Sequence, residues 1–385
     1  MKKIAILTAT RAEYGLLAPV IRKLNMEPEI DVRVVVTGMH LCREFGMTVD
    51  EIRQDGVHID REIDICIDSD TPAGISKTMS RALTGFADYF AENRPDALMV
   101  LGDRYETLAV CIAAMNERIP IIHLHGGEAT LGAVDEAVRN AITKMSYLHF
   151  TSTEEYRRRV IQMGEAPDRV FKSGAVGVEN ALNIERMTKC ELEESLGCRL
   201  GDSLAVLTFH PVTLENNTAQ NQIDELIKAM EKYPDITFLC TKANADVDGK
   251  IINASLQKCA DTNRNVLLYD SLGVRRYLSA LACAEFVIGN SSSGIIEVPS
   301  FGIPTINIGD RQKGRIQAES VINCEPFFED IAAAIEKARS AQFCSRIKDV
   351  ENPYGNGNAS DIIVSVTKDF LLNDKLDTRK NFYDI

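Results

Sequence analysis

Short apolar runs, many of them rich in β-branched residues, alternate along the chain with longer stretches in which apolar residues recur at helical spacing. Such nearly continuous runs are typical of parallel strands that are covered on both faces. The runs predict strands at Lys3–Thr8, Val32–Thr37, Ala97–Leu101, Ile119–Leu124, Tyr147–Phe150, Leu204–Thr208, Ile236–Cys240, Val266–Tyr269, Phe286–Ile288 and Thr305–Ile308. The helical spacing predicts helices at Leu17–Asn25, Ser76–Asn93, Glu106–Glu117, Asp135–Met145 and Asn221–Lys232. This alternation predicts an α/β fold with two doubly wound, Rossmann-like sheets of about five strands each.

The 385 residues are too many for one ordinary core, and about 150 residues per domain gives two to three domains. A pair of glycines, Gly174 and Gly177, predicts the boundary between an N-terminal Rossmann-like domain at 1–175 and a second Rossmann-like domain at 176–358. After an Asn- and Gly-rich break, we expect a helix and tail at 359–385 to cross back to the first domain.

The balance of charged residues limits the kinds of molecule that the protein is expected to bind. Lys and Arg number 43 against 56 Asp and Glu, a net charge of −13, which argues against nucleic acid and anionic membranes as partners. The N-terminus lacks a secretory apolar region, and no apolar stretch approaches the ~20 residues of a membrane span, so we expect a cytoplasmic protein. Ten cysteines without a C-x-x-C pair predict reduced, mostly buried thiols.

Polar and glycine-containing segments follow six of the predicted strands. In open α/β sheets, ligands bind beyond the carboxyl ends of the strands. Because such segments occur in both halves of the chain, we expect the two sheets to face each other across a cleft. The six segments are Ala9–Glu13, Gly102–Arg104, His125–Glu128, Phe209–Pro211, Gly289–Gly294 and Gly309–Arg311.

The segment Asn290–Gly294 has the composition of a phosphate-binding loop, because small residues, free N–H groups and the hydroxyls of Ser291 and Ser292 favour an anion. The alternative is an ordinary serine helix cap. Glu297 follows in the predicted helix, where it is placed either to accept both hydroxyls of a ribose or to be a solvated carboxylate.

Three basic or imidazole side chains follow strands in the two halves. Arg11 and Arg311 each present a planar fork of donors suited to phosphate, and surface ion pairs are the alternative. His210 is held extended by the proline that follows it, as a ligand-binding or acid group or as a structural histidine.

Acidic and imidazole groups gather in the first half. Several acids close together in a partly dry site raise one pKa enough for proton transfer near neutral pH. The pair His123 and His125 on one strand face suggests a metal site, but no third histidine or cysteine lies near in sequence, so no metal is expected. The predicted proton-transfer group is Asp103, His125, Glu128, Asp135 and Glu136.

At this point the motifs resemble a known family, the hydrolysing UDP-N-acetylglucosamine 2-epimerases of bacterial sialic acid biosynthesis. The resemblance covers about residues 1–360. The motifs that carry it, in order, are Thr10–Gly15, Thr37–His40, Gly102–Arg104, His125–Glu128, Ala141–Lys144, Phe209–Pro211, Gly289–Gly294 and Gly309–Arg315.

The resemblance implies a GT-B fold and conversion of UDP-N-acetylglucosamine and water to N-acetylmannosamine and UDP, by elimination across C1–C2 and then hydration, without a cofactor. It implies a homodimer or homotetramer. The catalytic residues that it implies are Asp103, His125, Glu128, Asp135, Glu136 and His210. The residues that it implies for nucleotide and substrate binding are Arg11, His40, His210, Ser291, Ser292, Glu297 and Arg311.

Many relatives carry a glutamate where His125 stands and a lysine where Leu16 stands, so either His125 or Glu128 takes the role of that glutamate. Three other functions stay open. One is hydrolysis and 2-epimerisation of a UDP-2,4-diacetamido-2,4,6-trideoxy sugar, as in a legionaminic acid pathway. The second is a GT-B glycosyltransferase, which needs an acceptor, and the third is a two-lobed sugar-binding protein without chemistry.

Overall fold

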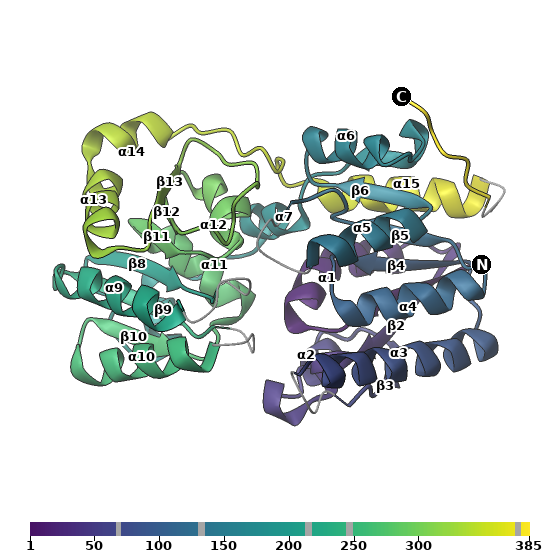
Figure 1. Cartoon of the computed structure of the whole chain (residues 1–385), viewed down its shortest axis with the longest axis horizontal. Coiled ribbons are helices and arrows are strands. Elements are labelled where there is room, and N and C mark those ends of the chain that lie inside the picture. The colour runs from purple at the N-terminus through teal and green to yellow at the C-terminus, as the bar shows by residue number, and fades with distance from the viewer. Residues whose placement is uncertain (67–70, 130–134, 212–217, 244–248, 374–378) are drawn as a thin grey trace. The chain divides into compact units, whose positions relative to one another are not determined.

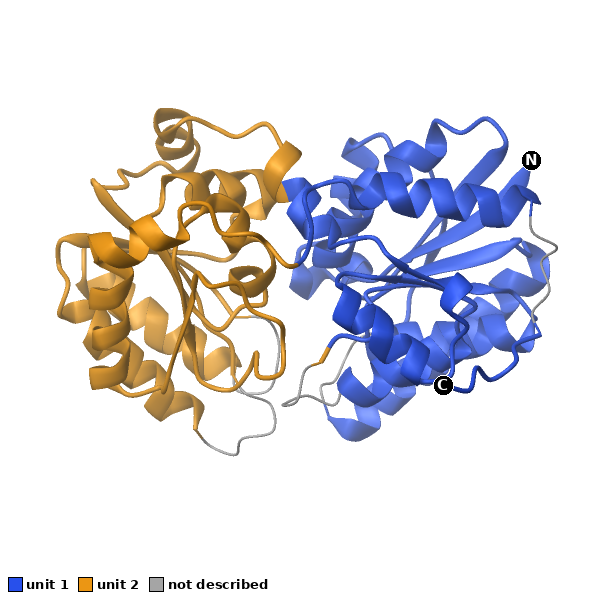
Figure 2. Ribbon diagram, turned by 90° about the horizontal axis from the view of Figure 1, so that it is seen from above, with its two compact units in different colours: residues 1–128, 134–180, 354–385 blue, residues 129–133, 181–353 orange. Residues whose placement is uncertain are grey.

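The computed structural model describes residues 1–66, 71–129, 135–211, 218–243, 249–373 and 379–385. The chain forms two compact units, coloured separately in Figure 2. Unit 1 comprises Met1–Glu128, Val134–Asn180 and Tyr354–Ile385, and unit 2 comprises Ala129–Ala133 and Ala181–Pro353. Unit 2 thus resumes at Ala181, close to the boundary predicted at 176, and the C-terminal segment belongs to unit 1.

Unit 1 is built on a parallel sheet of seven strands in the order β3-β2-β1-β4-β5-β6-β7. The order reverses between β1 and β4, which is the topological switch point of a doubly wound sheet. The strands are β1 (Lys2–Thr8), β2 (Ile30–Thr37), β3 (Ile59–Ile63), β4 (Ala97–Leu101), β5 (Ile121–Leu124), β6 (Leu148–Thr151) and β7 (Val170–Lys172).

Helices cover both faces of this sheet (Figure 1). On β1, Ile4 and Ile6 enter one core with α1 and α15, whereas Ala5 and Leu7 enter the opposite core with α3 and α4, as the two-residue period of a strand requires. The helices are α1 (Arg11–Asn25), α2 (Val49–Gln54), α3 (Pro72–Glu92), α4 (Tyr105–Asn116), α5 (Asp135–Met145), α6 (Glu154–Gln162), α7 (Val176–Asn183, at the boundary with unit 2) and α15 (Ala359–Asn373).

Unit 2 repeats the plan with six parallel strands in the order β10-β9-β8-β11-β12-β13. Its strands are β8 (Ser203–Thr208), β9 (Ile236–Thr241), β10 (Val266–Tyr269), β11 (Phe286–Gly289), β12 (Thr305–Ile308) and β13 (Val321–Cys324). Its helices are α8 (Lys189–Leu196), α9 (Ala219–Glu231), α10 (Gly249–Thr262), α11 (Gly273–Cys283), α12 (Ser293–Ile296), α13 (Phe328–Arg339) and α14 (Ala341–Ile347). The prediction of two doubly wound parallel sheets is confirmed.

The prediction of about five strands per sheet is wrong, because β3, β7 and β13 were missed. All three are edge strands. An edge strand buries less of its surface, so it needs no continuous apolar run: β3 reads Ile-Asp-Arg-Glu-Ile and has no fully buried residue. The apolar pattern therefore detects central strands better than edges.

The chain end returns to unit 1 in two places. Helix α15 packs against α1, and Ile363 and Leu371 enter the core beside it (Figure 1). Farther on, Lys380 places its ammonium 2.6 Å from the buried carboxylate of Glu165, while the N–H of Tyr383 donates to the carbonyl of Gly164 at 2.9 Å. The last described residues are thus tied down by polar contacts.

Glu165 is the centre of a buried charge cluster. Besides Lys380, its carboxylate contacts Lys144 Nζ at 2.7 Å and His149 Nε2 at 3.1 Å. Burial alone raises the pKa of Glu165, but hydrogen bonds from these three groups outweigh it and lower the pKa to about 2. The carboxylate is therefore ionised and stabilising at neutral pH.

All ten cysteines are free thiols. The expectation that they are mostly buried is wrong for Cys66, Cys190 and Cys344, which are exposed. Among the described residues, no helix is long and apolar enough to cross a membrane.

Candidate active site

The first motif begins α1. Thr10 caps the helix and accepts the N–H of Glu13 at 3.3 Å, while the Glu13 carboxylate accepts the N–H of Ala9 at 2.8 Å and that of Thr10 at 3.2 Å. This reciprocal capping box starts the helix at Arg11, before the predicted start at Leu17. Arg11 is half-buried and pairs with Glu51 at 3.1 Å, which matches the ion-pair alternative in this state.

Glu13, in the first turn of α1, forms a buried acidic pair with Glu106. Burial and the Glu106 carboxylate raise the pKa of Glu13 to about 7, although the Arg104 guanidinium acts in the opposite direction. Arg104 hydrogen-bonds one oxygen of the fully buried Glu106, and the other oxygen has no partner among the described residues. The sequence showed these residues only as parts of motifs, and not as a cluster.

Arg139 joins the predicted acids after β4 and at the start of α5. Its guanidinium, 2% exposed, pairs with Asp103, with Glu136 at 2.9 Å, and donates to the carbonyl of Glu128 at 2.6 Å. Asp103 and Glu136 keep 26% and 32% of their side chains exposed. Asp103, Glu128 and Glu136 are therefore brought together around one buried arginine, which sequence reasoning missed.

His125 follows β5 and faces Glu128. Its Nδ1 lies 3.3 Å from Glu128 Oε1, and the Ser152 hydroxyl donates to the same oxygen at 3.0 Å. Because β4, β5 and β6 are neighbours, Asp103, His125 and Ser152 follow three adjacent strands at one edge of the sheet. The structure thus assembles most of the predicted proton-transfer group within unit 1.

The two histidines around Leu124 do not share a strand face, which corrects the basis of the metal alternative. The strand ends at Leu124, and His125 turns with a φ of 67°. His123 is fully buried, with Nε2 2.8 Å from the Gly102 carbonyl, and burial lowers its pKa to about 3. Across the described residues, no three His, Cys, Asp or Glu side chains are arranged to hold a metal.

Two predicted residues stand apart from this group. Asp135 is exposed at the first position of α5. His40 is fully buried, with its Nε2 3.0 Å from Thr8 Oγ1 and its Nδ1 2.8 Å from Thr48 Oγ1, and burial lowers its pKa to about 4. Both ring nitrogens of His40 are occupied, so a binding role needs one of these bonds to be exchanged.

In unit 2 the predicted residues also follow adjacent strands, β8, β11 and β12. Asn290 links them: it accepts the N–H of His210 at 2.7 Å and donates to the His210 carbonyl at 2.8 Å, and its own carbonyl accepts Arg311 Nη1 at 3.0 Å and Gln312 Nε2 at 2.9 Å. Burial and the Arg311 charge lower the pKa of His210 to about 3, so its imidazole is neutral at pH 7.

The serine loop packs closely on the sheet. Gly289, with a φ of 134°, approaches Thr208 so tightly that a Cβ would lie 2.0 Å from its carbonyl oxygen, so only glycine is accommodated. Ser291 and Ser292 are half-buried. The following helix, α12, has only four residues, and Glu297 is at its C-terminal end; the predicted helix dipole at this loop is therefore small.

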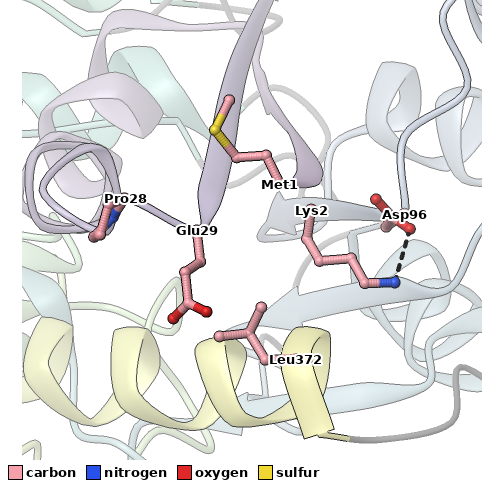
Figure 3. A pocket seen from close by; sticks show the side chains of 6 residues that line it. All are labelled: Met1, Lys2, Pro28, Glu29, Asp96 and Leu372. Atoms are coloured by element: carbon pink, nitrogen blue, oxygen red, sulfur yellow. Dashed lines mark hydrogen bonds and ion pairs between the residues drawn. The ribbon is translucent and has the colours of Figure 1, made fainter.

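The described residues of each unit line a cavity. One of about 550 Å³, lined by Met1, Lys2, Pro28, Glu29, Asp96 and Leu372, lies at the amino ends of β1, β2 and β4, away from the functional edge (Figure 3). The other, of about 650 Å³, lies in unit 2 at the carboxyl ends of β12 and β13, and Asp310 and Lys313 line it. Only the second flanks a predicted binding residue, Arg311.

Sequence reasoning missed Arg139 and Ser152. The signal for Arg139 was its position four residues after Asp135, one helical turn into a helix that opens with two acids. Ser152 carried no signal, because its role depends on β6 lying beside β5.

Two parallel α/β domains, with neutral His210 and Arg311 at the strand ends of one and a carboxylate–imidazole group in the other, define a two-domain enzyme fold of the GT-B class. The comparisons with known proteins agree. A family model described as UDP-N-acetylglucosamine 2-epimerase matches residues 22–368. The chain belongs to this family and is an enzyme, as the motifs predicted.

The relatives share the full length of the chain. Polysialic acid biosynthesis protein P7 of Escherichia coli is 43% identical over 100% of this chain and 98% of its own. The GDP/UDP-N,N'-diacetylbacillosamine 2-epimerase (hydrolyzing) of Campylobacter jejuni is 40% identical over 100% of this chain and 99% of its own.

Among solved structures, the UDP-GlcNAc 2-epimerase from Neisseria meningitidis bound to UDP-GlcNAc has a TM-score of 0.82 at 21% identity, over 96% of this chain and 100% of that one. At this identity the likeness establishes the fold.

Proposed function

We propose that the chain is a hydrolysing UDP-N-acetylglucosamine 2-epimerase that converts UDP-N-acetylglucosamine and water to N-acetylmannosamine and UDP for sialic acid biosynthesis. The family membership and the likeness to a polysialic acid biosynthesis protein support this substrate. The observation that carries the proposal is that buried Arg139 joins Asp103 to Glu128, whose carboxylate in turn faces His125.

The reaction needs two proton transfers and a stabilised leaving group. In the elimination, a base takes the C2 proton, the C1–C2 double bond forms, and the C1–O bond breaks with its electron pair on UDP. In the hydration, the hydroxyl of water adds to C1, and C2 receives a proton on its other face. Asp103 and the Glu128–His125 pair supply acceptors and donors for these steps.

We assign the nucleotide to unit 2. Arg311 offers a fork of donors to phosphate, with Ser291 and Ser292 adding hydroxyls, and neutral His210 has the capacity to donate to a phosphate oxygen without repelling Arg311. Glu297 is assigned to the ribose hydroxyls, and Arg11 in unit 1 to the diphosphate. In this assignment Asp135 and Glu136 assist the proton transfers.

A second substrate is favoured by one observation, the 40% identity to an enzyme named for N,N'-diacetylbacillosamine. Such a sugar differs from N-acetylglucosamine at C4 and C6, whereas the chemistry at C1 and C2 is the same. The catalytic group described above serves either sugar.

The test is turnover with Asp103→Asn. We expect this change to abolish release of UDP while leaving calorimetric binding of UDP largely intact, because Asp103 is assigned to proton transfer, and all the assigned nucleotide residues except Arg11 belong to unit 2. The matched control is Asp96→Asn, since Asp96 pairs with Lys2 at the opposite end of the same sheet. Turnover near the wild-type level in Asp103→Asn contradicts the assignment.

A further inference from the structure

His125 adopts a backbone conformation that is unfavourable for its residue type. Its φ of 67° is in the left-handed region, which is unfavourable for a residue with a Cβ. The surrounding structure holds the turn in place. The His125 N–H donates to the Phe150 carbonyl at 2.8 Å, and Gly127, with a φ of 77°, lies so close to Tyr156 that a Cβ would be 2.6 Å from its carbonyl oxygen. Backbone strain held in this way is typical of functional positions.

The surroundings of His125 favour one tautomer of its imidazole. Glu128 is 4% exposed, and a carboxylate oxygen accepts hydrogen bonds. Nδ1 lies 3.3 Å from Glu128 Oε1, an arrangement that suits a proton on Nδ1 and the lone pair on Nε2. Nε2 is buried and has no hydrogen-bond partner among the described residues. A buried acceptor without a donor is a second unfavourable feature on the same residue.

Glu128 is itself held in place at two points, its carboxylate and its backbone carbonyl. The Ser152 hydroxyl, fully buried after β6, donates to Oε1 at 3.0 Å. Arg139 donates to the Glu128 backbone carbonyl at 2.6 Å and pairs with Asp103, which ties the His125–Glu128 turn to the loop after β4. The carboxylate thus has a fixed orientation toward the imidazole.

We propose that Ser152, Glu128 and His125 form one hydrogen-bonded unit in which His125 Nε2 accepts the C2 proton, Glu128 fixes the tautomer, and Ser152 positions Glu128. His125 and Glu128 therefore act as a pair, and Ser152 is a positioning residue. This inference rests on the proposed function for the identity of the proton.

The proton balance is simple. Nε2 takes the C2 proton as the electron pair of that C–H bond forms the C1–C2 double bond and the C1–O pair departs on UDP. Glu128 stabilises the imidazolium that results, and the proton then passes to solvent. The new C2 proton comes from a different group on the opposite face, with water supplying the hydroxyl at C1 and reprotonating that group.

The tautomer is tested without any turnover, by nitrogen-15 NMR of histidine-labelled protein, with the His125 signals assigned from their loss in His125→Gln. In the wild type we expect a protonated Nδ1 and an unprotonated Nε2. Glu128→Leu removes the acceptor for the Nδ1 proton, so we expect the proton to move to Nε2. A wild-type ring protonated at Nε2, or a tautomer unchanged by Glu128→Leu, overturns the inference.

Steady-state kinetics tests the roles of His125 and Ser152. We expect His125→Gln to lower kcat by about 10²-fold or more. We expect Ser152→Ala to lower kcat by about 10-fold with KM nearly unchanged, since residues that orient a catalytic group contribute at this level. The matched control is Ser146→Ala, which removes another fully buried serine hydroxyl, one that donates only to the Ile142 carbonyl at 2.7 Å, and should leave kcat within about twofold.

The NMR and kinetic experiments together distinguish a failure of this inference from a failure of the proposed function. If the wild type releases no UDP from any UDP-amino sugar, the proposed function fails, while the NMR result still decides the tautomer. If the wild type turns over but His125→Gln is fully active, this inference fails and the proposed function stands. If Ser152→Ala does not fold, the wild-type and Glu128→Leu spectra decide.

Discussion

Replacing Arg139 by alanine removes the group on which the acids of unit 1 converge. The guanidinium is 2% exposed, and its partners include the carboxylates of Asp103 and Glu136 and the carbonyl of Glu128. After Arg139→Ala, two carboxylates face each other without the positive charge between them, and a backbone carbonyl loses its donor.

The size of the effect follows from burial. Removing one partner of a fully buried ion pair costs about 3–5 kcal/mol. Asp103 and Glu136 keep 26% and 32% of their side chains exposed, so water replaces part of what is lost. We therefore expect the low end, a loss of about 3 kcal/mol in the free energy of unfolding. Because Asp103 also loses its orientation, we expect kcat to fall by about 100-fold or more.

The assay combines urea unfolding with release of UDP. Arg157→Ala is the matched control. Arg157 donates to the carbonyls of Val170 at 2.7 Å and Pro167 at 3.1 Å, and neither is a predicted site residue, so this variant should lose stability and keep its kcat. Arg139→Lys keeps the charge without the planar fork, and an intermediate result is expected. If Arg139→Ala unfolds within about 1 kcal/mol of the wild type and keeps its kcat, the reasoning is wrong.

Three further predictions concern backbone and protonation. Gly289→Ala should prevent soluble expression or lower stability by more than about 3 kcal/mol, because its Cβ would meet the Thr208 carbonyl, whereas Gly309→Ala, with open space around it, should cost only about 1 kcal/mol in thermal unfolding. Its hydrogen bonds lower the pKa of Glu165 to about 2 from an ordinary 4.5, so the ionised carboxylate stabilises the fold fully above pH 4.5. This stabilisation is lost as the pH falls toward 2. The difference in the free energy of unfolding between the wild type and Glu165→Gln should therefore shrink over that range and not above it. His210, with its pKa lowered from 6.5 to about 3, should show no titration above pH 5 by proton NMR, and a midpoint near 6.5 contradicts its burial beside Arg311.

The sequence predicted the central strands well because they are buried on both faces and leave a continuous apolar run. It failed at edge strands such as β3, whose Arg61 and Glu62 side chains are exposed to solvent. Helix α5 was predicted with its exact bounds, Asp135–Met145, whereas α1 begins six residues early because the Glu13 capping box continues the helix through polar residues.

The site was predictable as far as its residues follow strands. Asp103, His125 and His210 were found in this way, since the carboxyl ends of parallel strands meet at one edge. Contacts that depend on which strands are neighbours, or on which side of a helix faces inward, could not be predicted from the sequence. For this reason Arg139 and Ser152 were found only in the structure. The left-handed backbone at His125 could not be predicted either, because a histidine in the sequence does not indicate that conformation.

The central claim is that this enzyme releases UDP and a free, C2-inverted sugar. The most direct measurement is to incubate the purified protein with UDP-N-acetylglucosamine, and in parallel with a UDP-2,4-diacetamido-2,4,6-trideoxy sugar, without any acceptor, and to identify both products by NMR in deuterated water. We expect UDP together with a free sugar, either N-acetylmannosamine or the 2-epimer of the second sugar. That sugar should carry one deuterium at C2. A UDP-linked epimer with no UDP released, or product that keeps its original C2 hydrogen, contradicts it.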